Sequence, residues 1–322
     1  MSFKREEGKK ILFQFVEDHP EYIILSDPDL DGVFTAAILA RVLNAEISRI
    51  QYPKPSEISS LKVMKSILIE LPITKGLTYV GRNVLIDHHE SPPSIALYNG
   101  VTKISEVLFD SGFKSVSRLI YHVFEEDVKI DENGLRLLDA IDQIDSGNIE
   151  SEIADSLNKA FLLNSMKEKV REELTLTIYR MDWNSIFNWV NRELSKWSVV
   201  EDTIEKMKES VKTIGDITYF TYDVTDQLES AARRILMLRL EENIGGIVLC
   251  IGLRRGKPVS ATIATRSNLN LNKVYENLRK NEGVRAGGRE NVGGIQFKTE
   301  LTLEDALRLI QDAVEKPLSN QT

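Results

Sequence analysis

The sequence predicts an α/β protein with an N-terminal parallel-sheet domain, a helical connector and a smaller C-terminal α/β domain. Three observations support this prediction. Short apolar runs alternate with helical patterns over residues 1–148, Gly and Pro become scarce over 149–214, and the alternation resumes over 215–322. A chain of 322 residues is long enough for such a division, at roughly 100–200 residues per domain.

Continuous apolar runs are typical of strands that are buried on both faces of a parallel sheet. In the N-terminal domain we expect such strands at residues 22–26, 66–71 and 84–87. Helical spacing predicts helices at residues 34–43, 116–125 and 133–144. A buried helix could produce any one of these short runs, but their alternation with helical segments favours strands.

The remaining elements follow from the same two patterns. In the connector, helical spacing covers residues 165–179 and 189–204. In the C-terminal domain we expect strands at 217–223, 247–253 and 259–265. Helices are expected there at 227–242, 269–281 and 303–314.

The composition excludes several classes of protein. The chain is 42% hydrophobic and 28% charged, which is enough apolar material to bury a core and excludes a disordered chain. Its single cysteine, Cys250, excludes a disulfide framework and a Cys-rich zinc module. The first residues lack the apolar run of a signal peptide, and no stretch reaches the ~18 apolar residues of a membrane span. We therefore expect no membrane partner and a cytoplasmic location.

The distribution of charge is more informative than its total. A net charge of −8 taken alone argues against a nucleic-acid partner. However, residues 254–298 hold ten Lys/Arg and three Glu, a net +7, so the rest of the chain carries −15. Scattered charges on solvated helix faces are one interpretation, but their concentration in one segment favours a path for single-stranded DNA, RNA or oligonucleotides.

Three carboxylates follow the first expected strand, at Asp27, Asp29 and Asp31, with Gly32 after them. Ligands bind at the carboxyl ends of strands in open α/β sheets, and carboxylates crowded there repel one another unless a cation neutralises them. A helix N-cap would explain one aspartate but not three. An EF-hand is excluded because a strand precedes the segment and Ile38 stands where that loop needs glutamate. The pattern indicates a metal site.

A second polar group, Asp87, His88 and His89, ends the strand expected at 84–87. An exposed polar loop is the alternative for the two histidines alone. Beside the aspartate cluster a metal site is the better interpretation. Imidazole and carboxylate together suit a divalent transition ion, Mn²⁺ first.

Two further candidates complete the acidic set. Glu70 lies at the end of the strand expected at 66–71. By the same argument about the carboxyl ends of strands, we expect its side chain at this edge of the sheet. On the helix expected at 133–144, Asp139 and Asp142 can share a face, and so can Asp142 and Asp145. A solvated helix face is the alternative for these three.

These motifs, in this order, resemble the DHH phosphoesterase superfamily, which includes the RecJ-type exonucleases. The first is D-x-D-x-D-G after a strand, the second is Asp-His-His after a later strand, and the third is an aspartate near the end of the first domain. The stretch RAGGRENVGG at 285–294 resembles the glycine-rich motif of the DHH-associated domain. The resemblance covers nearly the whole chain and implies three parts: a metal-binding domain at 1–148, a helical connector at 149–214 and a DHH-associated substrate-binding domain at 215–322. It also implies a cleft between the two domains.

The resemblance also implies roles for individual residues. It implies catalytic roles for Asp87, His88 and His89. It implies two metal ions, Mn²⁺ or alternatively Mg²⁺, held by ligands that match the family's motifs: Asp29, Asp31, Glu70, Asp87, His88 and either Asp142 or Asp145. The residues that would meet the substrate phosphate are Arg266, Arg285, Gly287, Gly288 and Arg289. A plain turn is the alternative for the glycines, and an exposed pair is the alternative for Arg266 and Ser267.

Three departures from the family pattern define a second hypothesis. Leu25 stands where many members have a histidine, Glu70 where they have an aspartate, and Arg289 where the glycine motif has a histidine. The first hypothesis is an Mn²⁺-dependent exonuclease or oligonucleotide phosphodiesterase. The second is a catalytically weak RecJ-like scaffold that binds the GINS complex and the replicative helicase in the replisome. Pyrophosphate hydrolysis is a third hypothesis, which the broad basic segment disfavours.

Overall fold

The computed structural model divides the chain into two compact units, Met1–Leu194 and Ser195–Thr322. It describes residues 2–54, 58, 61–73, 77–89, 92–110, 112–164, 167–267, 269–288 and 290–315. Each unit is a sheet covered by helices, so the predicted α/β class is confirmed. None of the helices in these ranges combines the length and apolar character that a membrane crossing needs.

The first unit is built on a six-stranded sheet in the order β2-β1-β4-β6-β7-β8. Its strands are β1 (Ile23–Ser26), β2 (Ile50–Gln51), β4 (Ser66–Ile69), β6 (Arg82–Asp87), β7 (Ser94–Asn99) and β8 (Thr102–Leu108). The first four in spatial order are parallel, and β7 and β8 are antiparallel additions. Ser26 is opposite Ile69, and Ile69 is opposite Ile86. The residues that follow β1, β4 and the core of β6 therefore emerge at one edge of the sheet.

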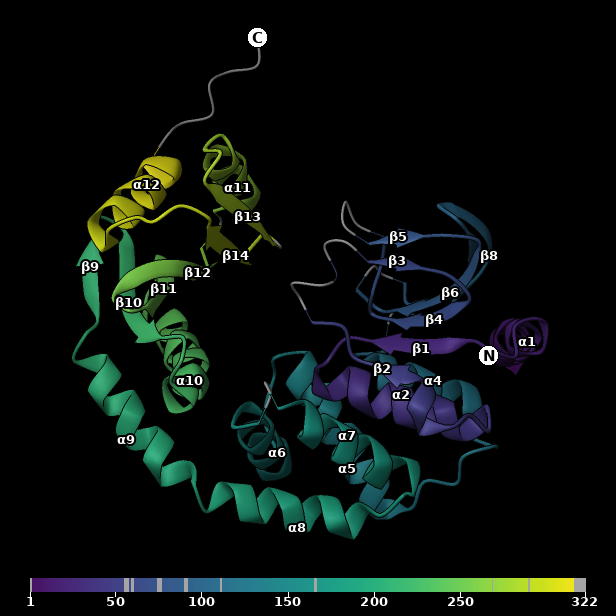
Figure 1. Cartoon of the computed structure of the whole chain (residues 1–322). Coiled ribbons are helices and arrows are strands. Elements are labelled where there is room, and N and C mark those ends of the chain that lie inside the picture. Colours follow the sequence, from purple (N-terminus) through teal and green to yellow (C-terminus); the bar gives the residue numbers. More distant parts are fainter. Residues whose placement is uncertain are drawn as a thin grey trace. The chain divides into compact units, whose positions relative to one another are not determined.

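Helices cover one face of this sheet (Figure 1). They are α1 (Ser2–Asp18), α2 (Leu30–Val42), α4 (Val116–Phe124), α5 (Glu132–Asp145), α6 (Glu152–Leu162), α7 (Glu168–Tyr179) and α8 (Trp183–Leu194). Helix α2 is buried along most of its length because Ala36, Ala37 and Ala40 allow close packing against β1, α4 and α7. Side-chain oxygens of Ser115 and Asp131 accept hydrogen bonds from the first turns of α4 and α5, and thus set where these helices begin.

A small second sheet covers the opposite face. Strands β3 (Lys62–Val63) and β5 (Thr78–Tyr79) pair in parallel, and Val63 and Tyr79 pack on Leu25, Leu68 and Leu85 of the main sheet. Leu25 and its partners are thus buried between two sheets. A short 3₁₀ helix (Ile47–Arg49) leads into β2.

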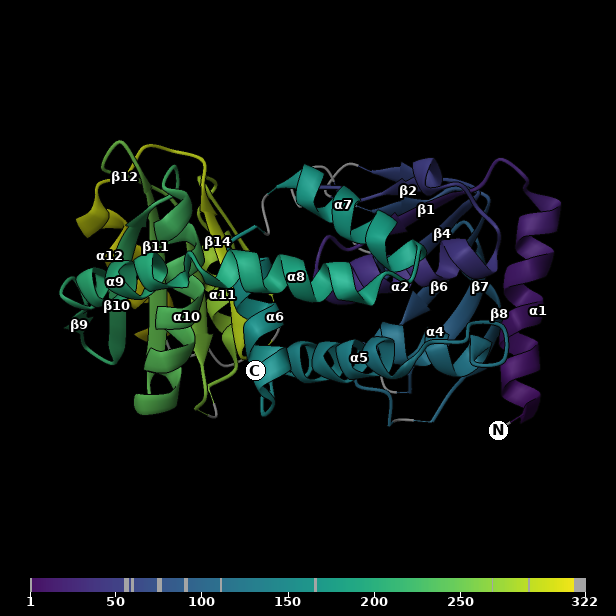
Figure 2. The same ribbon diagram turned by 90° about the horizontal axis from the view of Figure 1, so that it is seen from below.

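The second unit has a six-stranded sheet in the order β13-β14-β12-β11-β10-β9. Its strands are β9 (Lys212–Ile214), β10 (Ile217–Asp223), β11 (Ile247–Arg254), β12 (Lys257–Thr265), β13 (Val284–Gly288) and β14 (Val292–Phe297). Helices α9 (Trp197–Lys208) and α10 (Gln227–Asn243) contact each other and β10 (Figure 2). Helices α11 (Leu271–Arg279) and α12 (Leu303–Glu315) bury their apolar faces in a core with the strands.

Some elements differ from the prediction. The pattern over 189–204 is two helices, α8 and α9, which are separated by Ser195 and Lys196. The glycine-rich stretch at 285–294 is mostly a β-hairpin. Strands β13 and β14 pair in antiparallel fashion, and the last pair before the turn is Gly288 with Gly293. The residues predicted as a helical connector fall in α6 to α8 of the first unit and in α9 and strand β9 of the second. The three-part division at 148 and 214 stays a prediction.

Candidate metal centre

Four potential metal ligands converge at the carboxyl edge of the first unit's parallel strands. They are Asp31 in α2, Glu70 after β4, His88 after β6 and Asp145 at the end of α5. His88 Nε2 lies 3.1 Å from Glu70 Oε1, 3.1 Å from Asp145 Oδ2 and 3.9 Å from Asp31 Oδ2. One ligand atom from each residue lies within 4.8 Å of the others. Three carboxylates and one imidazole of this kind can hold a divalent cation.

Asp31 is held in place by the first turn of α4. Its two oxygens accept the backbone N–H groups of Val116 and Ser117, each at 2.7 Å, and the hydroxyl of Ser117. Thr35 adds a longer hydrogen bond of 3.3 Å from within α2. Burial nevertheless raises the pKa of Asp31 to about 6, assisted by the charge of Asp145 and opposed by the hydrogen bonds from Ser117. The carboxylate is therefore rigidly placed but needs a neighbouring positive charge.

Glu70 is the most constrained residue of the group. Its φ of +58° is in the left-handed region, which is uncommon for a residue other than glycine. Its side chain is buried, and Oε2 has no hydrogen-bond partner among the residues that the structure describes. Burial, followed by the charge of Asp31, raises the pKa of Glu70 well above its usual range. A strained backbone and an unsatisfied buried oxygen are features that persist at functional sites.

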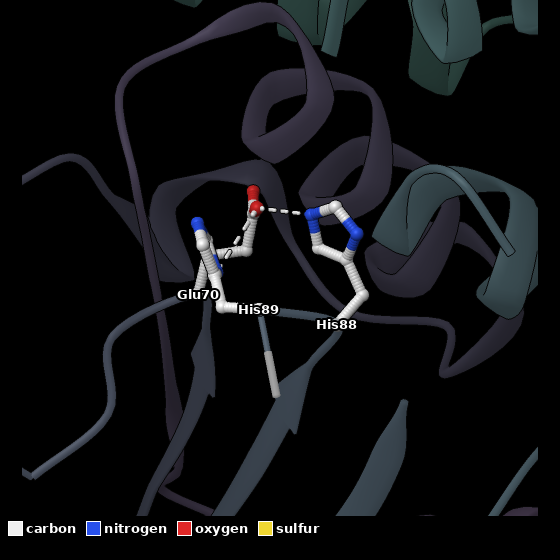
Figure 3. Close-up of side chains that lie close together, drawn as sticks. All are labelled: Glu70, His88 and His89. Carbon is white, nitrogen blue, oxygen red and sulfur yellow. Dashed lines mark hydrogen bonds and ion pairs between the residues drawn. The ribbon is translucent and has the colours of Figure 1, made fainter. Parts of the chain in front are cut away.

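His88 and His89 flank the Glu70 carboxylate, as Figure 3 shows. Burial lowers the pKa of His88, but hydrogen bonds to Asp145 and Glu70 and the charge of Asp31 outweigh that effect and raise it to about 10. At neutral pH the imidazolium of His88 therefore supplies the positive charge that the three carboxylates require. A metal ion that binds here has to displace this proton.

Asp87 and His89 form a separate pair beside the four-residue group. Asp87 Oδ1 is 3.0 Å from the backbone N of His89 and 2.8 Å from its Nδ1. Burial raises the pKa of Asp87, but the hydrogen bonds from His89 outweigh burial and leave it below its usual value. Asp87 is thus an anion that orients the ring of His89.

The first aspartates of the cluster have other surroundings. Asp29 is the N-cap of α2, and its Oδ1 accepts the backbone N–H of Gly32 at 2.8 Å. Burial raises the pKa of Asp27 to about 7, and the charge of Asp29 adds to the effect. Neither residue belongs to the groups of potential ligands that the described part of the chain forms.

We expect Gly32→Ala to destabilise the first unit and to weaken the site. A Cβ at this position would lie 2.1 Å from the backbone oxygen of Asp27 and 2.6 Å from Ser26 Oγ. Backbone has to move, so a loss at the upper end of the ~1–3 kcal/mol range for overpacking is expected. Urea unfolding measures the loss. Gly112→Ala, where a Cβ meets nothing within 4 Å, is the control and should change stability by less than about 0.5 kcal/mol.

The structure separates the two aspartates that the sequence left as alternatives. Asp145 joins the group, whereas Asp142 accepts hydrogen bonds from Ser115 Oγ at 2.5 Å and Arg118 Nε at 2.7 Å. Arg118 also pairs with the exposed Asp139. Asp142 and Asp139 therefore tie α5 to α4.

The predicted phosphate-binding residues lie in the second unit. Gly287 and Gly288 are in β13, and Gly288 has a φ of +156° with Gly293 backbone so close that a Cβ would clash. Arg285 is exposed on β13, and Arg266, which follows β12, lies 3.6 Å from Glu242. Arg289 lies outside the described residues. The phosphate-binding roles of these residues stay predictions.

Sequence reasoning missed the residues that support the site. Ser117 and Arg118 hold Asp31 and Asp142, respectively, through contacts between α2, α4 and α5. The available signal was Ser115, a good N-cap directly before the helix expected at 116–125. It indicates where α4 begins, but not that Asp31 faces this end of the helix.

Comparisons with known proteins bear on the fold. No family model and no curated protein matches the sequence. Among solved structures, the pGpG-specific phosphodiesterase PggH from Vibrio cholerae is 14% identical, with a TM-score of 0.54 over 91% of this chain and 99% of that chain. RecJ from Thermus thermophilus, in complex with Mn²⁺, is 14% identical, with a TM-score of 0.58 over 98% of this chain and 55% of that chain.

A third solved structure is similar to nearly the whole chain. The DHH domain of a member of a family of ribosomal proteins is 14% identical, with a TM-score of 0.55 over 98% of this chain and 91% of that chain. The chain therefore has the fold of DHH-domain proteins. More specifically, its fold is RecJ-like, and the predicted resemblance to the DHH phosphoesterases is confirmed at the level of the fold.

Proposed function

We propose that this chain is a metal-dependent phosphodiesterase that hydrolyses single-stranded nucleic acid or short oligonucleotides, with Mn²⁺ as its preferred ion. The observation that carries the proposal is the convergence of Asp31, Glu70 and Asp145 on His88, with one buried oxygen of Glu70 left unsatisfied among the described residues. The RecJ-like fold supports the reaction class. Among the structural neighbours are RecJ in complex with Mn²⁺ and a pGpG-specific phosphodiesterase.

The donor set favours Mn²⁺, with Mg²⁺ as the alternative. Carboxylate oxygens suit hard ions, while the imidazole of His88 favours a transition ion. Asp31, Glu70, His88 and Asp145 would hold the ion, and the unsatisfied Oε2 of Glu70 offers one more oxygen. When bound, such an ion polarises a phosphoryl oxygen and lowers the pKa of a water toward ~7.

The remaining chemistry falls to the Asp87–His89 pair. Asp87 holds the ring of His89 through Nδ1, which leaves Nε2 as the atom for proton transfer. The His89 side chain is about one-third exposed, at 32%, so a substrate oxygen can approach it. We therefore assign His89 the protonation of the leaving oxygen, which is general acid catalysis.

Binding of the nucleic-acid backbone is assigned to the basic segment of the second unit. Arg266 and Arg285 are exposed there and offer guanidinium groups that suit phosphate geometry. At Gly287 of β13 and Gly294 of β14 no atom lies within 4 Å of the place that a Cβ would take, so an anion can approach the backbone there. Each phosphate contact adds to a binding constant that falls with salt.

The test is cleavage of single-stranded DNA and RNA oligonucleotides that are labelled at the 5′ or the 3′ end. We expect Mn²⁺-dependent release of mononucleotides, with complete loss in a chelator. His88→Asn should reduce the rate at least ~100-fold because it removes the nitrogen on which the carboxylates converge. If Mn²⁺ binds and no oligonucleotide is cleaved, the hydrolase assignment is wrong and a binding role replaces it.

A further inference from the structure

We propose that a groove beside strand β2 binds an extended segment of a partner protein in which apolar and basic residues alternate. The groove belongs to the first unit and has a volume of about 680 Å³. Residues on both sides of β2, from Ile47 to Pro53, line it together with residues of α7. Such a partner would be additional to the nucleic-acid substrate and would not depend on the metal centre.

The apolar lining of the groove remains partly open to water. Five of its hydrophobic side chains are half-buried: Ile47, Ile50, Tyr52, Leu61 and Leu176. The hydroxyls of Tyr52 and Thr175 lie 2.7 Å apart, which fixes the Tyr52 side chain against α7. Single exposed hydrophobic residues are ordinary, but several that share one hollow indicate a binding surface. The groove therefore suits a ligand with apolar side chains.

Acidic side chains accompany the apolar lining. Glu168 and Glu172 of α7 are exposed and line the groove. Glu46 accepts a hydrogen bond of 3.1 Å from Ser48, another lining residue. None of the described lining residues is a lysine or an arginine. The ligand that complements this surface is therefore cationic as well as apolar, because an interface favours opposite charges and penalises like charges.

The basic residues that neighbour the lining in sequence do not offset these carboxylates. Arg49 donates to two backbone oxygens ahead of β1, and Lys169 forms an ion pair with Glu173. Arg171 is buried, and Lys54 does not line the groove. An acidic surface of this kind repels the phosphates of a nucleic acid, so a protein segment fits it better than an oligonucleotide.

Strand β2 offers an open edge to the backbone of the ligand. It is the terminal strand of the first unit's sheet and pairs with β1, where Ile50 is opposite Ile24 and Gln51 is opposite Leu25. No other strand in the described part of the chain pairs with it. An open edge can accept an extended peptide, whose side chains alternate between two directions. Alternate residues then face the apolar lining and the acidic side chains.

The experiment measures, by fluorescence polarisation, the binding of a short labelled peptide of alternating valine and lysine to the full chain. We expect saturable binding that weakens as salt screens the charges. A peptide of alternating valine and glutamate should not bind. Methylation of the backbone N–H groups of the valine–lysine peptide should weaken binding at least ~10-fold, because the methylated peptide cannot pair with β2.

Glu172→Lys and Glu173→Lys form a matched pair of variants. Both side chains are exposed on α7 and both changes add the same charge, but of the two only Glu172 lines the groove. We expect Glu172→Lys to weaken binding of the valine–lysine peptide at least ~10-fold, because a like charge replaces an opposite one. Glu173→Lys should stay within about threefold of the parent affinity.

Several outcomes would overturn the proposal. The first is the absence of binding by the valine–lysine peptide. An equal loss in both variants would show attraction to net charge in place of a site, and an unchanged affinity of the methylated peptide would exclude pairing with β2. Self-association of the chain that Glu172→Lys abolishes would assign the groove to a second copy. None of these results affects the test of Mn²⁺-dependent cleavage, so the two proposals fail separately.

Discussion

Asp145→Asn is expected to lower the affinity for Mn²⁺ at least ~100-fold, because even outer partners of metal ligands typically contribute ~10–100-fold. Asp145 Oδ2 lies 3.1 Å from His88 Nε2, and its loss removes one of the three carboxylates that face this nitrogen. Asparagine preserves the shape of the side chain but not its charge. Calorimetric titration with Mn²⁺ measures the change, and the rate of oligonucleotide cleavage should fall in parallel.

Asp142→Asn is the matched control, one helical turn earlier in α5. Its carboxylate binds Arg118 and Ser115 and is outside the ligand group. We expect an affinity for Mn²⁺ within about threefold of the parent chain. Because a charge-assisted hydrogen bond is lost, the free energy of unfolding should fall by about 1–2 kcal/mol. The reverse result, with Asp142→Asn losing the ion and Asp145→Asn keeping it, would show that the other aspartate is the ligand.

Mn²⁺ should stabilise the folded chain, and more so at pH 8 than at pH 6. Folding raises the pKa of Asp27 to about 7 and of Asp31 to about 6. The folded state therefore binds more protons than the unfolded state above pH ~4, and the metal-free protein loses stability as pH rises through these values. The pKa of Glu70, which burial raises well above its usual range, acts in the same direction. His88, with a pKa of about 10, gives stability that is fully present below pH ~6.5 and is lost as pH rises through about 10.

A bound cation reduces both losses of stability, the one from the carboxyl groups and the one from His88, because it replaces the protons that neutralise the cluster. At a free ion concentration of about 100 Kd the gain is about 2.7 kcal/mol, or roughly 5–10 °C in Tm for a domain of this size. Differential scanning calorimetry with and without Mn²⁺, under anaerobic conditions, measures the gain at each pH. Asp145→Asn should remove it. An equal gain at both pH values would mean that no proton is displaced when the ion binds.

The sequence predicts the position of the site better than its details. Asp31, Glu70 and His88 follow strands whose carboxyl ends share an edge, and a parallel sheet brings such residues together regardless of their distance along the chain. The choice between Asp142 and Asp145 depends on Arg118, which lies 24 residues before Asp142. Local spacing cannot show such a contact.

Two of the unpredicted elements of the fold, β8 and α1, have weak local patterns. Strand β8 lies at an edge of the sheet, and nearly all of its residues are exposed, so it lacks the apolar alternation that marks a half-buried strand. Helix α1 buries Leu12 and Phe15, but its N-terminal half is largely polar. Both elements form because they pack against or pair with other parts of the first unit, β8 with β7 and α1 with α4 and the sheet.

The four potential ligands of the candidate centre lie in α2, directly after β4, directly after β6 and at the end of α5, so they are far apart in the first unit's sequence. An ion held by all four would act as a cross-link that closes three long loops of the chain. Such a cross-link disfavours the partly open states in which α5 separates from α2 and α4, since every opening would have to break a ligand bond. The same ion that serves the chemistry would then also determine how often this edge of the molecule opens.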